Sequence, residues 1–311
     1  MRLLIIGASG FLGSHVWRQA SAAGMEVVTA GRSDMPGSRR HWPLDLAEEE
    51  PARIAAKLVD AAPDAVVNCA GATAGGPDLL SAANVTGAYA LATAMLMSSR
   101  PARLVHLGSA AEYGHSEQGV PVTELTVPRP VSAYGATKLA GTRLVQLART
   151  AGLDAVVLRV FNPVGPGIPD SSLPGRLAAE LRRAAQLGSD GGAVEIRLGP
   201  LDAVRDFVDA RDVAEAVLAA VAAASLPRPV LNVGSGLGVP VRSLVNELIS
   251  ISGCDVAVHE DAPGSARSAV VSWQQADVTA ARCDLGWQPR HTLASALDCL
   301  WKESCDALQC G

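Results

Sequence analysis

The stretch Arg2-Leu3-Leu4-Ile5-Ile6-Gly7-Ala8-Ser9-Gly10-Phe11-Leu12-Gly13 decides the fold, because an apolar strand runs directly into a glycine-rich turn and then a helix. In such a turn Gly7 allows the tight bend, Gly10 lets the main chain approach a pyrophosphate, and Gly13 packs the helix on the strand. The helix N-terminus adds unpaired N–H groups that favour phosphates. The stretch therefore predicts a dinucleotide-binding unit at the start of the chain.

A second chemical signal is Tyr134-Gly135-Ala136-Thr137-Lys138, which lies in a helical stretch downstream of Ser109 at the end of an apolar strand. A spacing of four places Tyr134 and Lys138 on one face of a helix. The ammonium stabilises a phenolate whose ordinary pKa is about 10, so that Tyr134 becomes a usable general acid or base. The chain has only three lysines, which disfavours an accidental surface pair. We interpret Ser109, Tyr134 and Lys138 as catalytic residues.

Composition and charge narrow the class of protein. A chain of 311 residues can bury an ample core and fits one large α/β domain or a domain with a smaller lobe. The net charge of -5, the scarcity of aromatic residues and the lack of basic runs longer than a pair disfavour a nucleic-acid groove. The first apolar run is too short for a signal peptide, and we expect that no apolar stretch reaches membrane-spanning length. We expect a cytoplasmic protein with neither nucleic acid nor membrane as a partner.

No metal site is expected. The six cysteines include no close Cys-x-x-Cys pair, and the histidines are scattered singly without ligand spacing. We interpret the cysteines as free thiols of a reducing compartment. His15, Glu112, His115 and Glu124 lie near the motifs, and we interpret them as helix-face or loop residues rather than catalytic ones.

Short apolar runs alternate with alanine-rich helical stretches along the first half of the chain. The runs cover residues 3–6, 26–30, 65–68, 104–107 and 155–158. Their alternation with helices predicts a parallel sheet wound on both faces. After Phe161, connections rich in Pro and Gly at 163–174 and 234–240 interrupt the regular winding, and a smaller lobe is expected to begin there.

Further motifs carry a family resemblance. They are Asn68-Cys69-Ala70-Gly71, Arg159-Val160-Phe161-Asn162-Pro163, Val204-Arg205-Asp206-Phe207-Val208 and Leu285-Gly286-Trp287. Together with the glycine turn and the Tyr-x-x-x-Lys step, they resemble the extended short-chain dehydrogenases/reductases of the NAD-dependent epimerase/dehydratase superfamily, in its nucleotide-sugar branch. The resemblance covers the whole chain. It implies a Rossmann-type doubly wound parallel sheet with a smaller interleaved α/β substrate-binding lobe, and we expect a homodimer.

The resemblance also implies a division of labour along the chain. Residues 1–165 would form the dinucleotide-binding domain, to which 203–234 returns, and residues 166–202 and 235–311 would mainly form the substrate lobe. The cofactor contacts expected from it are Gly7, Ser9, Gly10, Phe11, Leu12, Gly13, Arg32, Asp45, Leu46, Ala70, Gly71, Ala72, Leu107, Tyr134, Lys138, Phe161 and Val164.

The end of the second strand bears on the choice between NAD and NADP. An acid there binds the ribose hydroxyls of NAD and repels a 2′-phosphate. This chain has Ala30-Gly31-Arg32-Ser33, in which Arg32 could stack on adenine and pair with the phosphate. Asp34 keeps NAD open, since a small shift of the loop would bring its carboxylate to the ribose. We therefore predict NADP(H) as the preferred cofactor and NAD(H) as the alternative.

The segment Gly108-Ser109-Ala110-Ala111-Glu112-Tyr113-Gly114 narrows the reaction. Related 4,6-dehydratases carry Asp-Glu where this chain has Ala110 and Ala111, and 3,5-epimerase/reductases of the GDP-fucose type carry Cys at the position of Ala111. Reduction of a 4-keto sugar nucleotide and 4-epimerisation, which is the UDP-glucose 4-epimerase reaction, both remain. Both move hydride between nicotinamide and sugar C4, and Arg32 favours reduction because epimerases of this fold generally hold NAD.

The segment from Glu195 to Phe207 resembles GDP-4-keto-6-deoxymannose reductases and related NDP-hexose 4-ketoreductases, except that Pro200 stands where those usually have Asn. The nucleotide base, the sugar configuration and the face of hydride attack stay open. Ser109, Asn162, Arg205 and Arg267 are the expected substrate contacts, the two arginines for the diphosphate. A non-enzymatic NADP sensor or a non-sugar carbonyl reductase is disfavoured, because the first typically loses the Tyr-x-x-x-Lys pair and the second needs no diphosphate arginines.

Overall fold

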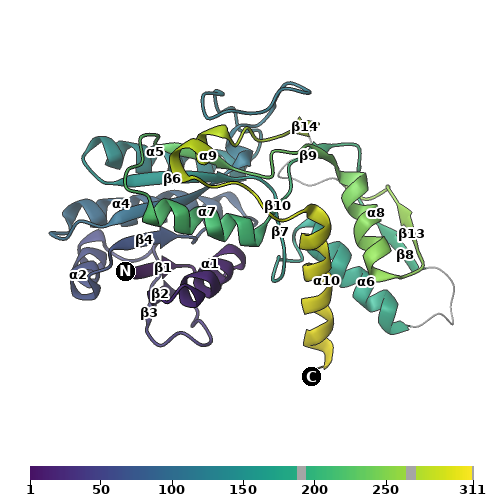
Figure 1. The fold of residues 1–311 in the computed structure, drawn as a ribbon, viewed down its shortest axis with the longest axis horizontal. Coiled ribbons are helices and arrows are strands. Elements are labelled where there is room, and N and C mark those ends of the chain that lie inside the picture. The colour runs from purple at the N-terminus through teal and green to yellow at the C-terminus, as the bar shows by residue number, and fades with distance from the viewer. Residues whose placement is uncertain (188–193, 264–270, 310–311) are drawn as a thin grey trace.

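The computed structural model describes residues 1–187, 194–263 and 271–309, and its centre is a parallel sheet (Figure 1). Seven strands follow the order β11-β6-β5-β4-β1-β2-β3, and neighbouring strands pair in parallel. Their bounds are β1 Arg2–Ile6, β2 Glu26–Gly31, β3 His41–Pro43, β4 Ala65–Asn68, β5 Arg103–Ser109, β6 Ala155–Val160 and β11 Val230–Val233. The five predicted strands and the doubly wound Rossmann-type fold are confirmed.

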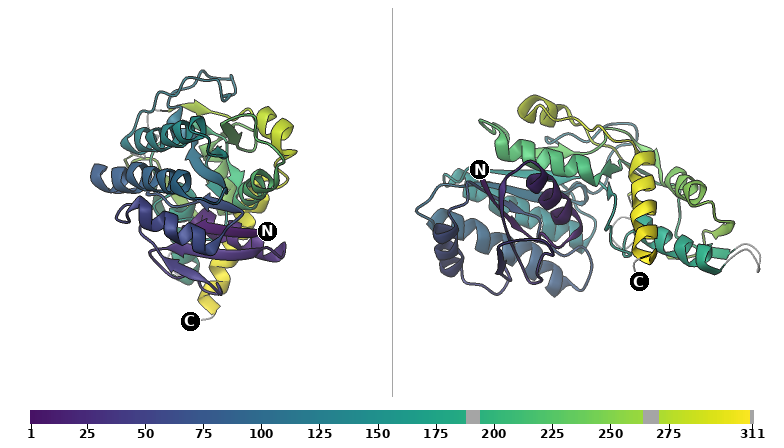
Figure 2. Two further views of the ribbon diagram at one scale, coloured as in Figure 1. Left: turned by 90° about the vertical axis from the view of Figure 1, so that its left-hand side faces the viewer. Right: turned by 60° about the horizontal axis from the view of Figure 1, so that its bottom comes forward.

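Side chains that alternate along β1 build a separate core on each face of the sheet. Leu3 and Ile5 belong to one buried cluster, whereas Leu4 and Ile6 belong to another, as the two-residue period of a strand requires. Helices cover both clusters (Figure 2). The first face carries α1 (Phe11–Ala22) and α7 (Ala210–Ala222), and the second carries α2 (Pro51–Ala61), α4 (Gly87–Met97) and α5 (Ala133–Thr150).

A third buried cluster lies in a smaller lobe at one end of the sheet, on the right of Figure 1. It includes Leu181, Leu248 and Leu297, one from each of three helices. Those helices are α6 Leu173–Leu187, α8 Val241–Ser252 and α10 Leu293–Gln309, and the short strands that join or support the lobe are β7 Pro163–Val164, β8 Val194–Arg197, β9 Val204–Arg205, β10 Val208–Asp209, β12 Val239–Pro240, β13 Val256–His259 and β14 Trp273–Gln274. Since α7 and β11 follow the first lobe segment and return to the main sheet, the lobe is interleaved.

The last third of the chain also contributes to the main domain. Helix α9 (Thr279–Leu285) places Ala281 in the buried cluster that contains Leu3 and Ile5, and Trp287, which follows α9, belongs to the same cluster. Trp287 Nε1 donates a hydrogen bond of 3.0 Å to the main-chain oxygen of Asp212 on α7. We propose that residues 1–165 and 203–234 form one unit and that residues 166–202 and 235–311 form the other. Only the larger part of the second unit forms the smaller lobe.

One sequence expectation is wrong: a stretch of membrane-spanning length does exist. Residues Pro77–Met97 form a continuous helical run of α3 (Pro77–Ser81), a π-helical turn (Ala82–Thr86) and α4, long and apolar enough to cross a bilayer by length and composition. Half of the most apolar window is buried inside the fold, and α4 packs between α2 and α5. The helix is apolar because it is rich in small alanines, which allow close packing in a core. Packing in the core is the role of α4 here.

Metal ligands and disulfides do not shape the described part of the fold. Across residues 1–187, 194–263 and 271–309, no group of three or more His, Cys, Asp or Glu could hold a metal ion. Cys69, Cys254, Cys283 and Cys299 are free thiols, as predicted for them.

Candidate active site

The carboxyl ends of the parallel strands bring the predicted motifs to one edge of the sheet. The glycine turn follows β1, the segment Asn68 to Ala72 begins at the end of β4, and Ser109 ends β5. Gly7 has a φ of +80° and lies so close to the neighbouring loop that an added Cβ would be 2.8 Å from the Ala70 nitrogen. The two loops therefore touch, and ligands of open α/β sheets bind at this edge.

The glycine turn is as tight as its sequence predicts. A Cβ on Gly13 would lie 2.0 Å from the Gly7 oxygen, so only glycine lets α1 start this close to β1. Gly10 precedes α1 as its N-cap and has no side chain to occupy the helix N–H groups, which leaves them for a phosphate. Phe11 and Leu12 point to different parts of the fold. Phe11 packs against the core of the smaller lobe, whereas Leu12 packs against the buried cluster that contains Leu3 and Ile5.

The Tyr-x-x-x-Lys step occupies the first turns of α5. Ser132 caps the helix by accepting a 3.2 Å hydrogen bond from the Gly135 N–H. A Cβ on Gly135 would lie 2.4 Å from the Ala111 oxygen, so the start of α5 packs directly on the 3₁₀ turn Ala110–Glu112 that follows Ser109. This close approach brings the segment that carries Tyr134 against the segment that carries Ser109.

The turn after Ser109 also packs against Arg129 and against Gln274 on β14. Gly114 has a φ of +70°, and a Cβ there would lie 1.8 Å from the Arg129 oxygen. The buried Gln274 on β14 donates from Nε2 to the Ala110 oxygen at 3.0 Å. The substrate lobe thus helps to hold the loop behind Ser109.

Lys138 is buried between the loop after β4 and strand β5. Its Nζ donates a 2.5 Å hydrogen bond to the Leu107 oxygen, and a Cβ on Gly71 would lie 3.9 Å from the same Nζ. Burial lowers the pKa of Lys138, while the negative charge of Glu112 acts in the opposite sense. The neighbouring Cys69 thiol has its pKa raised to about 12 by burial, which outweighs the lowering effect of Lys138.

The remaining predicted cofactor contacts fall into two groups. Asp45 accepts a 3.0 Å hydrogen bond from the Ala47 N–H, Leu46 packs near Gly87, and both lie just beyond β3. Ser9 is exposed at the glycine turn. Phe161 and Val164, by contrast, are almost fully buried, with Phe161 packed beside Tyr113, so any cofactor contact from them would use the main chain.

The loop after β2 lies open to solvent. Arg32, Ser33 and Asp34 are exposed, and no acid ends the strand. The Asp34 carboxylate lies 3.7 Å from His41 Nε2 on β3. The Asp34 side chain is 94% exposed.

Asn84 is a site residue that the sequence interpretation missed. It is 3% exposed in the π-helical turn, where its Oδ1 accepts from the Ala72 N–H at 3.0 Å. Its Nδ2 donates to the Ala72 oxygen at 2.9 Å and to Thr137 Oγ1 at 3.1 Å. Asn84 therefore ties the loop after β4 to the helix that carries Tyr134. The available signal was a lone amide inside an alanine-rich helix.

The predicted substrate residues are only partly brought together. Asn162 Nδ2 donates to the Asp206 oxygen at 2.8 Å, which places it beside the strand that carries Arg205. Arg205 is 7% exposed, and burial lowers its pKa. Its guanidinium donates to the oxygens of Val204 and Val271. Arg267 lies outside the described residues.

The carboxylates near Arg205 have other donors. Asp209 accepts from Arg211 Nη2 at 2.6 Å. Asp206 is fully buried and accepts from the main-chain N–H groups of Ser235, Gly236 and Ala276. Asp206 thereby joins its own segment to the Ser235–Gly236 turn and to Ala276, which follows β14.

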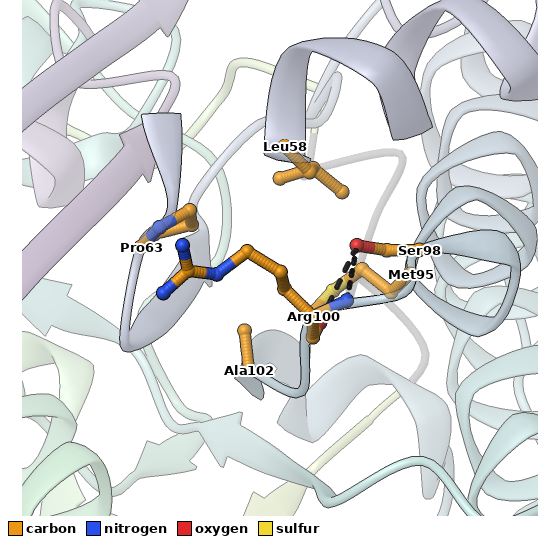
Figure 3. Close-up of a pocket in the computed structure, with 6 residues that line it drawn as sticks. All are labelled: Leu58, Pro63, Met95, Ser98, Arg100 and Ala102. Atoms are coloured by element: carbon orange, nitrogen blue, oxygen red, sulfur yellow. Dashed lines mark hydrogen bonds between the residues drawn. The ribbon is translucent and has the colours of Figure 1, made fainter. Parts of the chain in front are cut away.

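A small pocket elsewhere in the structure is not a candidate active site. Figure 3 shows its lining residues, of which Pro63 and Ala102 precede β4 and β5 at the amino ends of these strands. It offers about 10 Å³, roughly the room of one water molecule. Leu58, Met95, Ser98 and Arg100 complete its lining.

Comparison with known proteins identifies the family. The sequence profile of the NAD dependent epimerase/dehydratase family matches residues 3–234. The chain belongs to this family. The match runs from β1 to just beyond β11, so it takes in the glycine turn, Ser109 and the Tyr134 helix.

Several members of the NAD dependent epimerase/dehydratase family are similar over nearly their whole length. A dTDP-6-deoxy-L-talose 4-dehydrogenase (NAD(P)(+)) of Kitasatospora kifunensis is 40% identical, with 96% of this chain and 94% of the relative covered. A GDP-6-deoxy-D-mannose reductase of Pseudomonas aeruginosa is 28% identical, with 95% and 94% covered. The solved structure of RMD from Pseudomonas aeruginosa complexed with NADPH has a TM-score of 0.82 at 26% identity, with 98% of each chain covered. UDP-glucose 4-epimerases also occur among the relatives.

Proposed function

We propose that the protein is a nucleotide-sugar 4-ketoreductase, which reduces the C4 carbonyl of an NDP-4-keto-6-deoxyhexose with NAD(P)H. The observation that carries this proposal is the contact of the Tyr134 helix with the turn after Ser109, in which the two positions that follow the serine are Ala110 and Ala111 rather than acids. A dehydratase needs acids there to eliminate water. The names of two relatives, a 6-deoxytalose 4-dehydrogenase and a 6-deoxymannose reductase, support redox chemistry on a nucleotide-linked 6-deoxyhexose, and the first of them names C4.

The proposed mechanism assigns one task to each side chain. The glycine turn would hold NAD(P)H, which would supply the hydride for the C4 carbon. Ser109 Oγ–H donates a hydrogen bond to the carbonyl oxygen, and Tyr134 delivers its phenolic proton to that oxygen as negative charge develops. The phenolate left on Tyr134 is stabilised by the Lys138 ammonium on the same helix face. Asn162, Arg205 and Arg267 would bind the substrate, the arginines at the diphosphate.

Arg32 is proposed to set the preference for NADP(H). Loss of one charge-assisted contact with the 2′-phosphate costs about 1.5 to 3 kcal/mol. Arg32→Ala should therefore weaken NADPH binding by about 10- to 100-fold and leave NADH binding nearly unchanged, as measured by fluorescence titration. Arg39→Ala, an exposed arginine of the same loop, is the matched control. Equal weakening of NADPH and NADH would show that Arg32 only stacks on adenine.

A homodimer in the cytoplasm completes the proposal. Helix α4 exposes Tyr89, Leu96 and Met97, the adjoining α5 exposes Leu147, and the two helices pack side by side. A second copy would cover these apolar side chains. Light scattering on the purified protein should then give twice the mass of the chain.

The alternative function is 4-epimerisation, which the same catalytic residues would support and which the UDP-glucose 4-epimerases among the relatives favour. A reductase should consume NADPH in equal amount to a dTDP- or GDP-linked 4-keto-6-deoxyhexose, and it should purify largely without cofactor. An epimerase holds NAD tightly, because release in mid-cycle would strand the keto intermediate. Mass spectrometry of small molecules freed by denaturation, together with incubation of a UDP-hexose without NADPH, separates the two. Bound NAD and an inverted C4 would defeat the reductase proposal.

A further inference from the structure

Glu112 is a buried carboxylate with a complete set of donors next to the candidate catalytic serine. It is 0% exposed, and its Oε1 accepts from the Ser109 N–H and from Thr142 Oγ1, both at 2.9 Å. Its Oε2 accepts from Arg159 Nε at 2.8 Å, and that arginine lies 4.5 Å from the centre of the Tyr113 ring. Each donor comes from a different element: the end of β5, the middle of α5, and β6.

The main chain around this carboxylate is shaped to hold it. A Cβ on Gly108 would lie 2.7 Å from Glu112 Oε1 and 2.8 Å from a Val157 methyl, so glycine leaves the space that the carboxylate fills. Ser109 Oγ accepts from the Ala111 N–H at 3.2 Å while Glu112 binds the Ser109 N–H, so the two ends of the short turn fix each other. The φ and ψ of Ser109 are set by this reciprocal pair.

We propose that Glu112 is a positioning residue for the reaction, which sets Ser109 against the helix of Tyr134 and Lys138 by binding β5, α5 and β6 through one carboxylate. This proposal rests on the proposed reductase function, and it applies equally to the epimerase alternative, because both use the same three side chains. Glu112 itself touches none of the reacting atoms. Its bond to Thr142 lies one helical turn beyond Lys138, on the helix whose first turn packs on Ala111.

The charge of Glu112 gives the positioning role a second consequence. Its carboxylate raises the pKa of Lys138 against the larger lowering by burial. The other titratable groups around Lys138 are the Cys69 thiol after β4, His106 on β5 and Tyr134 on the same helix. Burial and the charge of Lys138 hold the pKa of His106 well below its ordinary value. The charge of Glu112 therefore favours the ammonium form of Lys138.

Kinetics of Glu112→Gln test the positioning role. The amide keeps the shape but loses the charge and one acceptor, and kcat should fall about tenfold or more, with the KM for the sugar nucleotide within about twofold. Thr142→Val, which removes one donor and leaves the carboxylate paired, should give a smaller fall and covers the case in which Glu112→Gln does not fold. Asp212→Asn is the matched control, since Asp212 is equally buried, binds His291 at 2.7 Å and belongs to α7 on the other face of the sheet. It should lower stability and leave kcat unchanged.

A measurement without substrate separates this proposal from the proposed function. The chain has three lysines, so NMR of protein labelled at the lysine side chains gives three signals, with Lys57 and Lys302 as internal controls. Glu112→Gln should lower the pKa of Lys138 and leave the other two lysine signals unchanged. If the wild-type protein turns over neither substrate class, the proposed function fails while the titration still decides the role of Glu112. A folded Glu112→Gln variant with wild-type kcat, or with an unshifted Lys138 titration, would overturn the positioning role.

Discussion

Tyr134→Phe is expected to lower kcat by about 10² or more. The substitution removes the phenolic proton that the proposed mechanism delivers to the C4 oxygen. Because the glycine turn and Lys138 remain, cofactor affinity should stay within about twofold of wild type. The measurement is a single-turnover assay with NADPH and a 4-keto-6-deoxyhexose nucleotide, which isolates the chemical step.

The chain offers two matched controls for this variant, since it has only three tyrosines. Tyr89 is 52% exposed on α4, and Tyr89→Phe should leave turnover unchanged. Tyr113 is fully buried and donates to Asn232 Oδ1 at 2.7 Å, so Tyr113→Phe should lower stability more than kcat. Turnover close to wild type in Tyr134→Phe would remove Tyr134 from the mechanism.

Arg159→Met is expected to lower the free energy of unfolding by about 3 to 5 kcal/mol. The substitution leaves the Glu112 carboxylate buried without its charged partner, and the desolvation of that charge is then uncompensated. It also removes the cation from the face of the Tyr113 ring. Urea denaturation followed by circular dichroism measures the loss.

A surface ion pair of similar geometry provides the comparison for Arg159. Arg197 Nη1 lies 2.5 Å from Asp261 Oδ2, but both side chains are about half exposed or more. Arg197→Met should therefore cost only about 0 to 1 kcal/mol, because exposed pairs are screened by solvent. Similar losses in the two variants would mean that burial of the Glu112 pair contributes little.

The sequence predicts the sheet well because its signal is local. Residues 3–6 form an apolar strand, and the glycine turn that follows it leaves no room for a side chain at Gly13. The parallel order of the strands then brings the carboxyl ends of β1, β4 and β5 together. The Tyr-x-x-x-Lys step is also local, since helix geometry alone pairs its ends. The structure accordingly places Lys138 against the loop after β4.

Residues whose role depends on distant partners escaped prediction. Glu112 meets Thr142 and Arg159 only after folding, from 30 and 47 residues away, so its sequence neighbourhood indicates no more than a loop residue. Asn84 likewise has its partners in another loop and another helix. The role of Arg267 remains a prediction, and the choice between Arg32 and Asp34 depends on a loop open to solvent.

The close approaches at Gly13, Gly114 and Gly135 bear on how a deep mutational scan of this protein would read. A Cβ would come within 2.0, 1.8 and 2.4 Å of a main-chain oxygen at these positions, so no other residue fits without displacement of the backbone. Selection for activity would score them as intolerant as Ser109 or Tyr134, although the glycines take no part in proton transfer. Only a parallel selection for cellular abundance would separate the two kinds of intolerance, because glycine variants would disappear from the folded pool while Tyr134→Phe would persist in it.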